Sequence, residues 1–122
     1  MKKAFVFLIF IILSINLSFS QEVDCEDLLE YIETNGSYKT SLSNYTLNSS
    51  WLYEVTAYEY DFEIYVIAKI KRNEYDYSPR SYIFCGIPSE NWSDFQYGGY
   101  SDSDSYGDRF HKYIKDYQCT CY

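Results

Sequence analysis

The chain has 122 residues, of which 47% are hydrophobic, 21% aromatic and 23% charged, and its formal net charge is −8. This length corresponds to one small domain, and it excludes a two-domain enzyme, a doubly wound nucleotide-binding fold and an α/β barrel. The acidic balance disfavours non-specific binding to nucleic acid, because like charges repel the phosphate backbone.

Residues 1–20 have the organisation of a secretory signal peptide. A pair of lysines precedes the apolar run of residues 4–13, and small serines lie at the first and third positions before a cleavage site after Ser20. A membrane span needs about 20 apolar residues, so we expect no stable membrane anchor. We therefore predict a secreted or periplasmic protein that begins at Gln21. It would have 102 residues and a net charge of −10, because only the two lysines are lost.

The four cysteines all follow the predicted cleavage site, and cysteines of exported proteins usually form disulfides. Only one residue separates Cys119 from Cys121, so a bond between these two would be strained. We therefore expect Cys25 and Cys85 each to pair with one of the two, in an order that the sequence leaves open. A metal site is the alternative, but a single histidine and a Cys-x-Cys spacing give it little support. We predict no cofactor.

Residues 21–49 predict a separate N-terminal helix followed by a polar linker. Between Asp24 and Glu33 the apolar side chains recur every three or four residues, which is the period of a helix with one buried face. Gly36 marks the end of this helix. Residues 36–50 are rich in serine, asparagine and threonine, and we expect them to form a connecting loop.

Residues 50–122 predict a small α+β domain. Residues 51–60, 64–70 and 81–85 are rich in β-branched and aromatic side chains and predict strands. Their short links indicate a three-stranded antiparallel meander. Every second residue from Ile64 to Ile70 is apolar, so this face of the sheet should cover a core.

Helices are expected after the last strand. Residues 89–95 predict a short helix, and a final helix should begin near Ser105 with an apolar stripe from Phe110 to Tyr117. The predicted fold class is therefore α+β, with a three-stranded antiparallel sheet packed by a C-terminal helix.

Residues 50–117 resemble the KTSC domain, which is named after the C-terminal extension of some lysyl-tRNA synthetases. The resemblance rests on segments in the family's order: Ser49-Ser50-Trp51-Leu52, Ala57-Tyr58-Glu59-Tyr60, the strand 64–70, Tyr82-Ile83-Phe84, Ile87-Pro88 and the segment 107–114. Phe84 replaces the second tyrosine of the family's pattern, and residues 96–106 form a longer loop. The family's function is not established. Its synthetase context implies RNA binding, against which the signal peptide and the acidic charge argue.

Tyrosine is unusually frequent, with 16 residues, and aromatic side chains on strands can bind a peptide or sugar rings. Two groups of basic residues could add a positively charged patch to this surface if the fold brought them together. The first group is Lys69, Lys71, Arg72 and Arg80, and the second is Arg109, Lys112 and Lys115. The alternative is that the tyrosines are half-buried packing residues and that the charges are scattered. The candidate binding surface consists of Tyr58, Tyr60, Tyr65, Tyr82, Phe84, Arg109 and Lys112.

Two further candidate sites are weaker. The segment Asp102–Asp108 resembles the beginning of a calcium loop, but Tyr106 and Tyr113 occupy ligand positions of an EF-hand, so only an irregular calcium site stays open. Cys85 with His111 could form a nucleophile and a base, but we expect this cysteine to form a disulfide. No catalytic motif is recognisable, and we predict that the protein is not an enzyme.

The sequence therefore predicts an exported binding or interaction module. Its partner would be a protein, a peptide or a glycan, which the sequence does not distinguish. The alternative is an RNA-binding module, as the KTSC context suggests.

The intact mass of the protein from its native host tests the export prediction. We expect a mass that begins at Gln21, with alkylation of the four cysteines only after reduction. A full-length mass with four freely alkylated cysteines would contradict it and would favour RNA binding.

Overall fold

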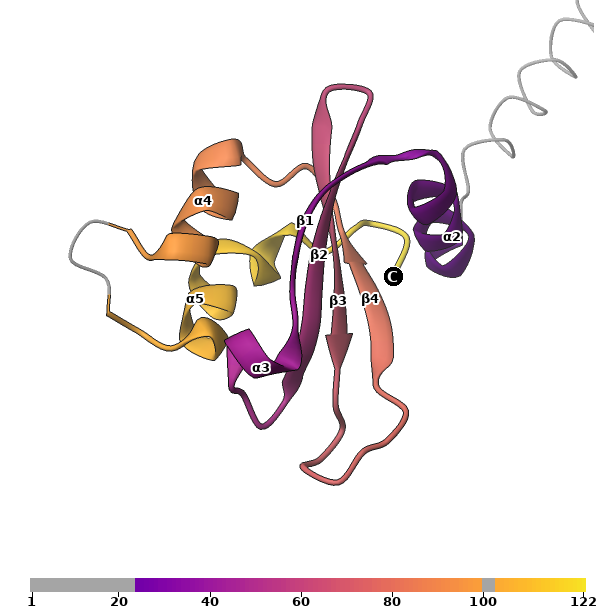
Figure 1. Cartoon of the computed structure of the whole chain (residues 1–122). Helices are drawn as coiled ribbons and strands as arrows, with labels where there is room; N and C mark the ends of the chain where they lie inside the picture. Colours follow the sequence, from indigo (N-terminus) through magenta and orange to yellow (C-terminus); the bar gives the residue numbers. More distant parts are fainter. Residues whose placement is uncertain (1–23, 100–102) are drawn as a thin grey trace, which may run out of the picture.

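The computed structural model describes residues 24–99 and 103–122, and it shows an antiparallel sheet with helices on both faces (Figure 1). The sheet has four strands in the order β1-β2-β3-β4, a simple meander. The strands are β1 (Ser37–Leu42), β2 (Leu52–Tyr60), β3 (Glu63–Ile70) and β4 (Arg80–Phe84). The helices are α2 (Cys25–Asn35), α3 (Asn44–Leu47), α4 (Ser89–Tyr97), α5 (Tyr106–Tyr113) and the 3-10 turn η1 (Lys115–Tyr117).

The α+β class is confirmed, but the prediction of three strands is wrong. The additional strand, β1, comes from the segment that we expected to be a loop, and α3 follows it in the same segment. β1 is an edge strand, with a bulge between Tyr38 and Thr40, and only Leu42 in it is buried. A strand that is exposed on most of its surface needs few apolar residues, so it leaves no hydrophobic alternation in the sequence.

The three predicted strands are present, and their alternation defines the main core. Side chains from one face of β2 and β3, such as Val55, Val66 and Ala68, pack against α4 and α5. From these helices, Phe95 and Phe110 are almost completely buried. The apolar alternation from Ile64 therefore faces a core, as predicted.

The opposite face of the sheet is covered by α2. Ile32 of this helix is buried with Ile67 of β3 and Ile83 of β4 in a second, smaller core. Asp24 caps the helix by accepting a hydrogen bond from the Glu26 backbone N–H, at 3.0 Å. The helix thus forms where the apolar period indicated.

The C-terminal segment extends the sheet along the outer edge of β4. The Cys85 N–H donates to the Tyr117 carbonyl at 2.8 Å, and Phe84 forms an isolated bridge with Gln118. The final helix is shorter than predicted, because the helix ends at Tyr113 and only η1 continues it. The chain is then free to run beside β4.

Two disulfides fix this segment. Cys25 bonds to Cys121 and Cys85 to Cys119, with Cα–Cα distances of 5.2 and 5.0 Å. Each upstream cysteine therefore pairs with one member of the C-terminal pair, as predicted. The two disulfides indicate an oxidising environment, extracellular or periplasmic. No helix within residues 24–99 and 103–122 has the length and apolar character of a membrane span.

Removing the disulfides one at a time should reveal their unequal contributions. The sequence separations are 96 and 34 residues. From these loop lengths we expect the double substitution Cys25→Ala/Cys121→Ala to lower the free energy of unfolding by about 5 kcal/mol, and Cys85→Ala/Cys119→Ala by about 4 kcal/mol. Urea denaturation followed by tryptophan fluorescence measures both. Wild-type stability in either variant would contradict the pairing.

Candidate functional site

The structure places the predicted aromatic binding residues on opposite faces of the sheet. Tyr58, Tyr60 and Tyr65 are half-buried beside α2, in the second core. Tyr82 is half-buried and Phe84 is buried on the face covered by α4 and α5. These five residues therefore do not form one continuous surface.

The tyrosines beside α2 are joined in pairs. The hydroxyls of Tyr31 and Tyr60 form a hydrogen bond of 2.5 Å, and Tyr38 contacts Tyr58 edge to face. Burial, followed by the hydrogen bond that its hydroxyl donates to Glu63, raises the pKa of Tyr65. In Tyr60, the hydrogen bond to Tyr31 is the main cause of a raised pKa. The hydroxyls of Tyr60 and Tyr65 therefore stay protonated at neutral pH and act within the fold.

Arg109, predicted as a surface residue, is buried and holds the chain before α5. Its guanidinium donates to the Phe95 carbonyl at 2.8 Å and to the Asp104 carbonyl at 2.8 Å, and it lies 4.1 Å from the centroid of the Tyr106 ring. Lys112 forms an ion pair with Asp104. Both basic residues thus stabilise the same region of the fold.

Other members of the predicted basic groups also have acidic partners. Arg72 donates to Asp76 at 3.2 Å, and this hydrogen bond holds the pKa of the Asp76 carboxyl well below its ordinary value. Lys69 lies 3.8 Å from Glu54. Three of the seven residues in the two basic groups are thus paired with carboxylates and Arg109 is buried, which reduces the positive charge that RNA phosphates could contact.

An aromatic groove lies on the α5 side of the sheet. It has a volume of about 270 Å³ and lies between the start of β2, the end of β3, β4 and α5. Its walls are mainly apolar, with cationic and amide groups at the rim. The groove is lined by Trp51, Ile70, Tyr82, Phe84, Phe110, His111, Lys115 and Gln118.

Trp51 is fixed in this groove by its backbone and by its ring contacts. Its carbonyl accepts from the Lys71 N–H at 2.7 Å, and its indole lies 5.7 Å from the Phe110 ring and 5.2 Å from the His111 ring, between centroids. The buried Gly107 permits this approach, because a Cβ there would lie 3.0 Å from the indole Nε1. The aromatic wall is therefore formed before any ligand binds.

The predicted binding surface contains two of the groove residues and the predicted basic groups contain a third, Lys115, but the sequence analysis missed their arrangement. Tyr82 and Phe84 were included in the candidate surface as aromatic residues of a predicted strand. Trp51 was predicted as the first residue of a strand, and His111 was considered only as a base beside Cys85. The sequence contained one usable signal, namely Gly107 in the first turn of a helix, where glycine is unfavourable. A glycine there indicates a close contact.

The remaining predicted sites have limited support in the described residues. Within residues 24–99 and 103–122, no three His, Cys, Asp or Glu side chains are grouped to hold a metal ion. Of the candidate calcium loop, Asp102 lies outside the described residues. Cys85 is bonded to Cys119, so its sulfur is not available as a nucleophile beside His111.

No protein-family model, curated protein or solved structure matches the chain. The resemblance to the KTSC domain therefore stays a prediction.

Replacing Arg109 by lysine should test its structural role. Lysine keeps the charge but lacks the planar fork that reaches several carbonyls, so we expect the free energy of unfolding to fall by about 2 kcal/mol. Lys112→Gln is the matched control, and its loss should stay below about 1 kcal/mol because its ion pair is exposed. Urea denaturation measures both, and equal losses would contradict this assignment.

Proposed function

We propose that the protein is an exported, non-catalytic binding module whose aromatic groove holds one large apolar side chain of a protein partner. The single observation that carries this proposal is the groove with its fixed Trp51. The disulfides and the predicted signal peptide of residues 1–20 support export.

The size of the groove favours a side chain over a larger ligand. Pockets for cofactors and drug-sized molecules usually have volumes of about 300–1,000 Å³. The groove has a volume of about 270 Å³, which is enough for one aromatic or large aliphatic side chain. Aromatic residues such as Trp51 and Tyr82 are enriched at the centres of protein interfaces.

The rim of the groove favours an acidic neighbour of that side chain. His111 and Lys115 are exposed at the rim, and Gln118 supplies an amide. A carboxylate of the partner beside the inserted side chain would pair with Lys115. The preferred ligand is therefore an extended peptide segment in which a large apolar residue has acidic neighbours.

Protein binding is favoured over RNA binding by the charges. Lys69, Arg72 and Lys112 lie in ion pairs, and Arg109 is buried. The overall net charge of −8 opposes a polyanion.

Binding of capped peptides, followed by NMR, tests the groove. A peptide with tryptophan between two glutamates should shift the Trp51 indole N–H signal, whereas its counterpart with two lysines should bind at least five times more weakly. Lys115→Gln should weaken the glutamate peptide about threefold, because one charge pair at the rim is lost.

Lys39→Gln is the matched control, since Lys39 is remote from the groove and its substitution should leave the affinity unchanged. Equal binding of both peptides, or shifts confined to other residues, would contradict the proposal. An oligonucleotide that binds more tightly than the peptides would favour the RNA alternative.

A further inference from the structure

The tip of the β2–β3 hairpin has an unusual turn. Tyr60 pairs with Glu63, so the connection consists of Asp61 and Phe62 alone. Both turn residues have positive φ angles, 51° and 66°. Turns of this kind usually contain Asn-Gly or Asp-Gly, because glycine adopts a positive φ without strain. A phenylalanine at the second position is therefore unfavourable for the isolated chain.

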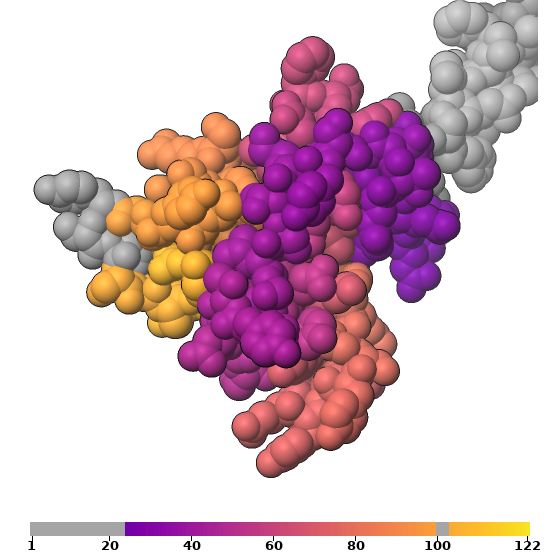
Figure 2. Space-filling view, viewed as in Figure 1, coloured from indigo at the N-terminus to yellow at the C-terminus, as the bar shows by residue number. Residues whose placement is uncertain are grey.

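Phe62 gains nothing within the fold that would offset this strain. Its side chain is 97% exposed. The space-filling view shows the hairpin tip protruding at the top of the molecule, beyond α2 and α4 (Figure 2). A large apolar side chain in a strained, protruding position points to a contact with another molecule.

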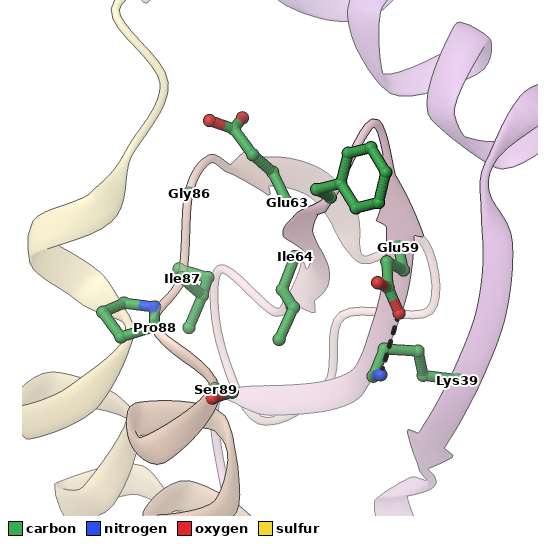
Figure 3. Close-up of a pocket in the computed structure, with 9 residues that line it drawn as sticks. Lys39, Glu59, Glu63, Ile64, Gly86, Ile87, Pro88 and Ser89 are labelled. Carbon is green, nitrogen blue, oxygen red and sulfur yellow. Dashed lines mark hydrogen bonds and ion pairs between the residues drawn. The ribbon is translucent and has the colours of Figure 1, made fainter.

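A depression of about 380 Å³ lies beside this side chain. Figure 3 shows the side chains of Ile64, Ile87 and Pro88 near one another, the Glu59 carboxylate beside Lys39, and the Glu63 carboxylate pointing away from the three apolar side chains. Ile64 and Ile87 are 9% and 3% exposed, so they contribute a small apolar floor. The depression is lined by Lys39, Glu59, Phe62, Glu63, Ile64, Gly86, Ile87, Pro88 and Ser89.

The surroundings of Phe62 are acidic. Asp61 and Glu63 flank it in the sequence and are exposed, and Glu59 lies across the depression. Lys39 is the cation among the lining residues, and it pairs with Glu59 at 3.2 Å. A partner that carries arginine or lysine would therefore find complementary charge and an aromatic face for cation–π contact.

We propose that the hairpin tip is a second docking surface, which binds a cationic segment of a partner protein. Phe62 packs against an arginine or lysine of that segment, Asp61 and Glu63 pair with its charge, and a neighbouring apolar side chain enters the depression. A second copy of this chain is the less suitable occupant, because it presents the same acidic residues. This surface is separate from the aromatic groove, since Trp51 precedes the start of β2 and Phe62 follows its end.

The substitution Phe62→Gly separates binding from stability. The probe is a capped hexapeptide of alternating arginine and leucine, with a glutamate–leucine peptide as the charge control. We expect the arginine peptide to shift the amide signals of residues 59–64 and 86–89, and Phe62→Gly to weaken its binding at least fivefold. Because glycine relieves the turn, the Tm of Phe62→Gly should rise by about 4 °C. Binding should also weaken with added salt.

Tyr77→Gly is the matched control, because Tyr77 is also an exposed aromatic residue of a loop, at 94%. It should leave the affinity for the arginine peptide unchanged. Equal binding of the peptide to wild type and Phe62→Gly would overturn the proposal, as would equal binding of the glutamate peptide. Shifts confined to the groove would also overturn it while leaving the proposed function intact. Self-association that Phe62→Gly abolishes would instead assign the surface to a second copy.

Discussion

The fold depends on the attachment of its last residues to the edge of the sheet. Cys119 and Cys121 have only one residue between them, yet they bond to Cys85, directly after β4, and to Cys25 of α2, which belong to different parts of the chain. This pair of bonds therefore holds the N-terminal helix over one face of the sheet while the tail covers the outer edge of β4. A domain of this size has a small core, and covalent closure compensates for the limited apolar burial. The groove lies next to this closure, since Gln118 belongs to its rim.

The parts of the fold that could be predicted from the sequence are those in which one buried face requires apolar residues at a regular spacing. Strands β2, β3 and β4 pack against a core and therefore alternate, and α2 shows a helical apolar period for the same reason. β1 buries only Leu42 and is held to β2 mainly by backbone pairing, with polar side-chain contacts such as the hydrogen bond between Ser41 and Thr56. Sequence patterns report side-chain burial, so a strand held mainly by its backbone was not detected.

The candidate site was predicted less well, because it combines residues that are distant in the sequence. Tyr82 was identified as an aromatic residue of a predicted strand, but its neighbours Trp51 and His111 reach the groove only through the order of the strands and the position of α5. Arg109 illustrates the opposite error. Its charge suggested exposure, whereas its guanidinium satisfies backbone carbonyls that would otherwise be buried without a donor.

Three unusual local features among the described residues differ in whether contacts within the fold offset their cost. The Trp51 indole packs closely on Gly107, and the contact is possible because glycine has no Cβ; it forms part of the packed wall of the groove. Arg109 is buried, but its donors have acceptors. At both positions an unusual local feature has its compensation inside the fold. Phe62 lacks such compensation, because its backbone is in an unfavourable region and its side chain is almost fully exposed. An exposed phenylalanine at a positive φ angle contributes nothing to the stability of the fold, so its unfavourable conformation is offset by a contact outside the chain. The hairpin tip is therefore better explained by binding than by folding.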